Sequence, residues 1–77
     1  MKDFMLKIET KMYELRFKNY MRLKEVNMNK ARKHLFDDNL TKYKKYMERV
    51  RNYLWKIQNI TLDAEENNIS MKTWFNS

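Results

Sequence analysis

Apolar residues recur every three or four positions through most of the chain, which is the spacing of one face of an α-helix. The most regular run lies between residues 36 and 57, and its apolar positions are Phe36, Leu40, Tyr43, Met47, Val50, Leu54 and Ile57. Asp37, Asp38 and Asn39 are residue types that favour a helix N-terminus. The pattern therefore predicts a helix over about 39–59 that buries this seam.

The first part of the chain carries two apolar stripes on one predicted helix. The longer stripe, which we expect to be the core face, consists of Met1, Phe4, Met5, Ile8, Met12, Leu15, Leu23 and Val26. The second stripe consists of Leu6, Tyr13, Phe17 and Tyr20, with Met21 beside it. One helix over about 3–27 would thus offer apolar surface to two neighbours.

The remaining segments are less regular. Asn27 and Asn29 interrupt the pattern, so residues 30–36 are either a short helix or an extension of the first one. A last helical turn is expected over about 62–75, capped in part by Ser70. The chain has no glycine or proline, so asparagine is expected to end its helices.

These elements predict an all-α fold in one domain spanning residues 1–77. Two long antiparallel helices form a helical hairpin, and a short C-terminal helix completes a small three-helix domain. At 77 residues the core is small, and the absence of cysteine excludes disulfides as extra support. Oligomerisation or a bound partner remains, and a homodimer through the second stripe is one alternative.

Positive charge is concentrated in the helical part of the chain. Residues 1–58 carry sixteen lysines and arginines against seven acidic residues, whereas residues 59–77 carry one against three. The predicted helix over 39–59 places a ladder of cations opposite its seam, over about 21 Å. The ladder is Lys42, Lys45, Arg49 and Lys56, and Lys30, Arg32 and Lys33 form a further basic cluster. The ladder either keeps the helix soluble or binds nucleic acid or an acidic partner.

Two apolar features have a similar double interpretation. The stripe of Tyr13, Phe17, Tyr20 and Met21 either packs under the C-terminal tail or forms a protein interface. Trp55 lies away from the seam. We expect Trp74 or Phe75 of the tail to cover it, and the alternative is that it serves as an anchor for a partner.

The sequence offers little for catalysis. His34, Asp37 and Asp38 are too few for a metal site, and the paired carboxylates are better explained as helix caps. Serine occurs at Ser70 and Ser77 alone, and no glycine-rich loop exists to hold a phosphate. We therefore expect no enzyme activity and no cofactor. The N-terminus has no apolar stretch suited to a signal peptide or a membrane span, so we expect a cytoplasmic protein.

The lysine- and asparagine-rich, glycine-free composition resembles that of accessory proteins of phages and other mobile elements. That resemblance implies a small inhibitor, for example of a host defence nuclease. The preferred hypothesis is a non-enzymatic regulator or inhibitor that binds a larger protein or nucleoprotein complex. The alternative hypothesis is a basic helical dimer that binds nucleic acid directly.

Overall fold

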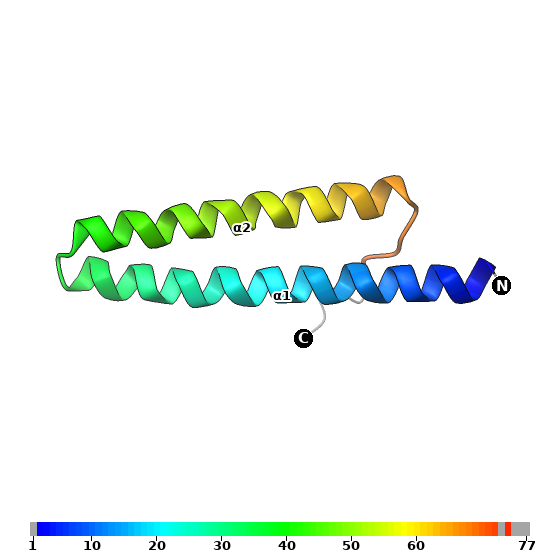
Figure 1. Ribbon diagram of the computed structural model, residues 1–77, viewed down its shortest axis with the longest axis horizontal. Helices are drawn as coiled ribbons and strands as arrows, with labels where there is room; N and C mark the ends of the chain where they lie inside the picture. Colours follow the sequence, from blue (N-terminus) through cyan, green and yellow to red (C-terminus); the bar gives the residue numbers. More distant parts are fainter. Residues whose placement is uncertain (1, 73, 75–77) are drawn as a thin grey trace.

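The fold is a hairpin of two long helices that run antiparallel. The computed structural model describes residues 2–72 and 74, with side chains from residue 7 onward. Helix α1 spans Lys2–Phe36 and helix α2 spans Leu40–Glu66, and together they form a rod of 55 × 21 × 15 Å (Figure 1). The predicted all-α class and the pairing of two long helices are confirmed. In the described tail, residues 67–72 and 74, there is no third helix, and the rest of the predicted one lies outside the described residues.

Helix α2 is longer than its sequence pattern predicted, and in α1 residues 30–36 extend the first helix, which is one of the two predicted alternatives. Helix α1 continues without a break through Asn27 and Asn29 to Phe36. The side-chain amide of Asn27 donates a 2.8 Å hydrogen bond to the carbonyl of Leu23, so this asparagine is accommodated inside the helix. Helix α2 likewise runs past Asn59. Asparagine was expected to end the helices, but neither Asn27 nor Asn59 does so.

The two helices end in the same way. After α1, Asp38 adopts a left-handed φ of 57°, the Asp38 N–H donates to Leu35, and the Asn39 N–H donates to the His34 carbonyl at 2.8 Å. After α2, Asn68 has the same φ, and the Ile69 N–H donates to the Ala64 carbonyl at 2.9 Å. This is the Schellman motif, in which Asp38 and Asn68 occupy the position that glycine usually takes.

The start of α2 is capped as the sequence predicted. Asn39 is the N-cap residue, and its side-chain oxygen accepts a 3.2 Å hydrogen bond from the Lys42 backbone N–H. One of the four N–H groups left without a partner at the helix start is thereby satisfied.

The core lies at the open end of the hairpin, where the tail joins the two helices. Its buried residues are Phe17, Ile60, Ala64, Ile69 and Trp74, and partly buried Tyr13, Tyr20, Met21, Ile57 and Met71 pack against them. The second stripe of α1 is therefore the core face. The longer stripe was expected there, and that prediction is wrong, since Ile8, Met12, Leu15 and Val26 are 43–59% exposed.

The seam predicted for α2 is buried in part. Val50 is buried at 1% exposure, and Tyr43, Met47 and Ile57 are partly buried. Phe36, Leu40 and Leu54 are exposed. The face that meets α1 continues through Ile60 and Ala64, beyond the predicted end of the helix. Ala31 on α1 is fully buried, and a side chain this small lets the two backbones approach closely.

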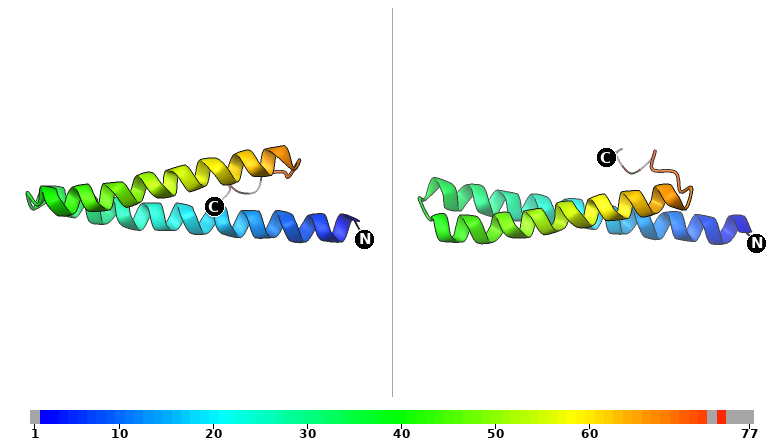
Figure 2. Two further views of the ribbon diagram at one scale, coloured as in Figure 1. Left: turned by 45° about the horizontal axis from the view of Figure 1, so that its top comes forward. Right: turned by 90° about the horizontal axis from the view of Figure 1, so that it is seen from above.

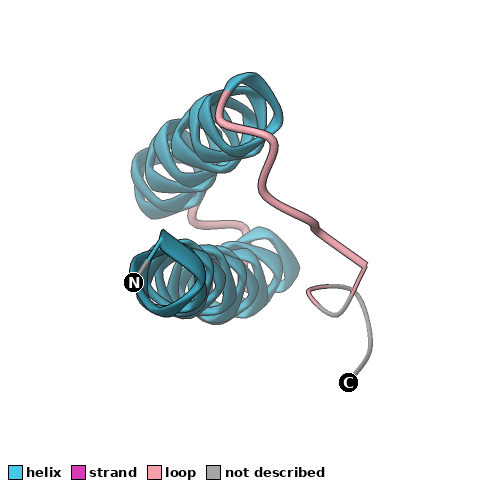
Figure 3. Ribbon diagram, turned by 90° about the vertical axis from the view of Figure 1, so that its right-hand side faces the viewer, coloured by secondary structure: helices cyan, strands magenta, loops and turns pink. Residues whose placement is uncertain are grey.

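The tail turns back from α2 and runs down one side of α1 (Figures 2 and 3). There Trp74 lies against Phe17, with their ring centroids 5.2 Å apart and the rings tilted by 35°. Trp55 is 66% exposed, so the described tail does not cover it. The prediction that the tail shields Trp55 through Trp74 is therefore wrong, and Phe75 lies outside the described residues.

Candidate functional site

The antiparallel packing brings cations from both helices onto the side of the hairpin opposite the tail. We call this the basic face, and its charged residues are Arg16 and Lys30 of α1 and Lys42, Lys45, Arg49 and Lys56 of α2. At 100° per residue these positions lie to one side of the line of contact between the helices. The contacts described below place Lys30, Arg49 and Lys56 there directly.

The centre of the loop-end half of this face is Tyr46. The His34 ring is stacked on the Tyr46 ring at 5.3 Å between centroids and an angle of 6°. The Lys30 ammonium lies 5.7 Å from the Tyr46 ring centroid, and the Arg49 guanidinium lies 5.2 Å from it. One ring thus orders two cations from different helices, because a cation is attracted to the negative face of an aromatic ring.

A second cation–ring group lies closer to the middle of the rod. Tyr20 of α1 and Tyr53 of α2 approach to 6.3 Å between ring centroids. The Lys56 ammonium lies 5.8 Å from the Tyr20 centroid and 5.4 Å from the Tyr53 centroid. Three cations of the face are therefore held in defined positions by tyrosine rings.

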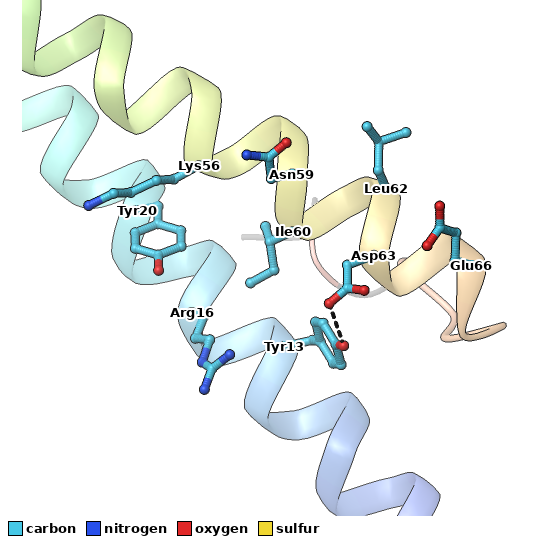
Figure 4. A pocket seen from close by; sticks show the side chains of 9 residues that line it. All are labelled: Tyr13, Arg16, Tyr20, Lys56, Asn59, Ile60, Leu62, Asp63 and Glu66. Carbon is cyan, nitrogen blue, oxygen red and sulfur yellow. Dashed lines mark hydrogen bonds between the residues drawn. The ribbon is translucent and has the colours of Figure 1, made fainter.

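Two hollows lie along the same face, and Lys56 borders both. The smaller one has a volume of about 240 Å³ and is lined by Asn27, Arg49, Asn52, Tyr53 and Lys56. The larger one, of about 510 Å³, lies at the open end and includes Arg16, Tyr20, Asp63 and Glu66 in its wall (Figure 4). The smaller hollow is lined by two cations, two amides and one tyrosine, a set without a carboxylate that suits an anionic group. Acidic side chains enter the wall at the open end.

At that open end a hydrogen bond joins the two helices. The Tyr13 hydroxyl donates to the Asp63 carboxylate at 2.8 Å (Figure 4). This hydrogen bond, followed by desolvation and the negative charge of Asp63, raises the pKa of the Tyr13 phenol above its ordinary value. Asp63 is thereby engaged with Tyr13, and the bond links the two helices at the open end.

The structure separates the predicted binding residues into three sets. Lys30, Lys42, Lys45, Arg49 and Lys56 share the basic face, whereas the helical positions of Arg32 and Lys33 turn them away from it. Phe17 is buried, and Tyr13, Tyr20 and Met21 are half-buried beside it, which is the tail-packing alternative for that stripe. Trp55 remains exposed to solvent.

Sequence reasoning missed Arg16 as a member of this face. Arg16 and Lys30 are fourteen residues apart in the sequence, so they lie near the same side of one helix after about four turns. The spacing of Arg16 and Lys30 is visible in the sequence. It places them on the basic face only once the second stripe of α1, and not the longer one, is known to pack against α2.

Other chemistry finds little support among the described residues. No three histidine, cysteine, aspartate or glutamate side chains come together there as metal ligands, and His34 is stacked on Tyr46. Within that same part of the chain, neither helix has a segment apolar and long enough to cross a membrane. Comparisons with protein-family models, with curated proteins and with solved structures find no match to this chain.

Proposed function

We propose that the protein is a non-catalytic regulator of a larger nucleoprotein complex and that its basic face binds the nucleic-acid backbone of that complex. The observation that carries the proposal is the joining of Lys30 of α1 with Arg49 of α2 around one tyrosine ring. Two rows of cations, about 8–10 Å apart across the hairpin, match a polyanion better than a single helix face does.

The cations of this face have no carboxylate partners in the described part of the chain. The ion pairs found there join Lys18 to Glu14 at 3.0 Å and Lys24 to Glu25 at 3.8 Å, and none involves the basic face. Unpaired cations carry diffuse counterions, and release of these counterions drives binding to phosphates. The six side chains are therefore available for contact without breaking an internal ion pair.

The tyrosines favour contact with phosphates over stacking on bases. Stacking on single-stranded bases needs exposed aromatic faces beside basic groups. Here the Tyr46 ring is already occupied by His34, Lys30 and Arg49, and Tyr20 and Tyr53 lie against Lys56. The rings therefore position the cations, and the mode of binding that remains is independent of sequence and requires no unpaired bases.

Gel retardation of a short DNA duplex over a range of salt concentrations tests this proposal. If four to six phosphates are contacted, the logarithm of the association constant should fall with the logarithm of salt concentration with a slope of about −4 to −5. Replacing four residues of the basic face with glutamine, K42Q/K45Q/R49Q/K56Q, should remove most of this slope. A single-stranded oligonucleotide of the same length should bind no more tightly than the duplex.

The chain offers a control of equal charge. The variant R32Q/K33Q/K44Q/R51Q removes four cations from positions turned away from the basic face. It should retain the slope of the wild type, provided that circular dichroism shows both variants to be folded. Equal losses in the two variants would show that net charge and not the face drives binding. Absence of retardation at low salt would refute nucleic-acid contact and leave an acidic protein surface as the target of this face.

A further inference from the structure

The apolar stripe left on the outside of α1 is a second contact surface beside the basic face, and the two surfaces share Arg16 and Lys30. Ile8 is 45% exposed, Met12 51%, Leu15 59% and Val26 43%. These four positions share the side of α1 that faces away from α2, over about 27 Å of helix. Asn19 interrupts the stripe near its middle, and it accepts a 3.1 Å hydrogen bond from Arg22.

Cations border this outer stripe along both edges. Lys11 and Arg22 lie on one edge, and Arg16 and Lys30 lie on the other, by their positions on the helix. Among the described residues none of these four forms an ion pair. Lys18, also on the first edge, is paired with Glu14, and Glu9 is the acidic residue on the second edge. The outer stripe is thus an apolar seam with predominantly positive borders.

These borders decide against a second copy of this chain as the occupant. In antiparallel packing of two copies that matches Ile8 with Val26, Lys11 of one copy would lie beside Arg22 of the other. In parallel packing, the Lys11 edge of one copy would face the Arg16 and Lys30 edge of the other. Both arrangements place cations against cations, which costs binding energy at an interface.

We propose that the outer stripe of α1 binds an amphipathic helix of a protein partner whose apolar seam is bordered by carboxylates. Such a helix buries Ile8, Met12, Leu15 and Val26 in helix-to-helix packing, and its carboxylates pair with Lys11, Arg22, Arg16 and Lys30. Asn19 lies within the seam, where a single polar residue sets the register of a helix pair.

Two synthetic peptides of about 21 residues test this proposal. Both carry leucine at the two seam positions of each heptad, and the flanking positions are all glutamate in one peptide and all lysine in the other. Like charges keep each peptide from associating with itself at neutral pH. By isothermal titration, the glutamate peptide should bind the full-length protein at least about tenfold more tightly than the lysine peptide, and the difference should shrink as salt rises.

Variants of the seam show whether the peptide uses the outer stripe. M12Q/L15Q removes two exposed apolar side chains without changing charge, and it should weaken binding of the glutamate peptide by about 10- to 100-fold. The matched control is W55Q, which removes an exposed apolar side chain of α2 and should leave binding unchanged.

Several results would overturn the proposal. The glutamate peptide binding no better than the lysine peptide would remove the charge argument, and wild-type affinity in M12Q/L15Q would remove the apolar one. A concentration-dependent dimer in sedimentation that M12Q/L15Q dissociates would assign the stripe to a second copy. Met12 and Leu15 lie outside the basic face, so the outcomes for M12Q/L15Q do not depend on whether that face binds nucleic acid.

Discussion

Replacement of Trp74 by alanine tests whether the tail is part of the folded core. Trp74 is 3% exposed and contacts the Phe17 ring at 5.2 Å. Truncation of a buried tryptophan to alanine costs about 3–5 kcal/mol. The buried indole N–H has no acceptor among the described residues, and removing such a donor returns about 1–3 kcal/mol. From the midpoints of these two ranges the net loss should be about 2 kcal/mol. The total stability of a chain of this size is about 4–12 kcal/mol.

Urea denaturation followed by circular dichroism measures the loss. Trp74→Phe is the informative companion, because it keeps an aromatic ring against Phe17 and removes the unpaired N–H, so it should stay within about 1 kcal/mol of the wild type. Trp55→Ala is the matched exposed control and should change the free energy of unfolding by less than about 0.5 kcal/mol. If Trp74→Ala and Trp55→Ala unfold at the same urea concentration, the assignment of the tail to the core is wrong.

Three further changes test the hydrogen bond at the open end and the turn between the helices. Because the folded-state pKa of Tyr13 is raised, the Tyr13–Asp63 bond should stabilise the fold fully below about pH 10 and lose its effect as pH rises through the folded-state pKa. Tyr13→Phe should abolish this component of the alkaline unfolding curve. Asn39→Ala should lower the free energy of unfolding by about 1 kcal/mol, since it removes the cap on the Lys42 N–H. Asp38→Gly should raise it by about 0.5–1 kcal/mol in thermal melts, because glycine adopts a φ of 57° without strain.

The sequence could predict the helices but not which of their faces is buried. Periodicity identifies an apolar stripe, and α1 has two, of which the longer was predicted to be the core. The structure buries the second stripe because its members Tyr13, Phe17 and Tyr20 carry large rings, and each ring removes more apolar surface from water than an aliphatic side chain. A count of apolar positions gives Met12 and Phe17 equal weight. In the structure Met12 is exposed and Phe17 is buried.

The sequence left open whether residues 30–36 extend the first helix, and the structure shows that they do. Asn27 has low helix propensity, but within a helix its amide can bond to the carbonyl one turn earlier, as it does to Leu23. Asn27 is also 7% exposed, so tertiary packing holds it in place. At the hairpin turn the prediction of a helix start at Asn39 is confirmed. There the asparagine is followed by a new series of apolar residues at helical spacing.

The candidate site was predictable where it depends on one helix and not where it depends on two. The spacing of Lys42, Lys45, Arg49 and Lys56 is visible in the sequence, and α2 places them along one side. Lys30 lies on the same face as these four residues, whereas Arg32 and Lys33 do not. Both facts depend on how α1 is rotated about its axis relative to α2. That rotation is set by the buried rings at the open end of the rod. These rings belong to the stripe of α1 that the sequence pattern did not predict to be the core face.

The apolar core and the cations around Tyr46 lie in different halves of the rod. The open end holds the apolar core, whereas the loop-end half of the helix interface contains the buried amide of Asn27, the small Ala31 and the stack of His34 on Tyr46. Lys30 and Arg49 both lie within 6 Å of that Tyr46 ring centroid, where their like charges repel one another. An anionic ligand between them would relieve this repulsion and would bind the folded hairpin in preference to the unfolded chain. If the basic face binds a polyanion as proposed, the loop-end half is therefore the half whose stability the polyanion would increase.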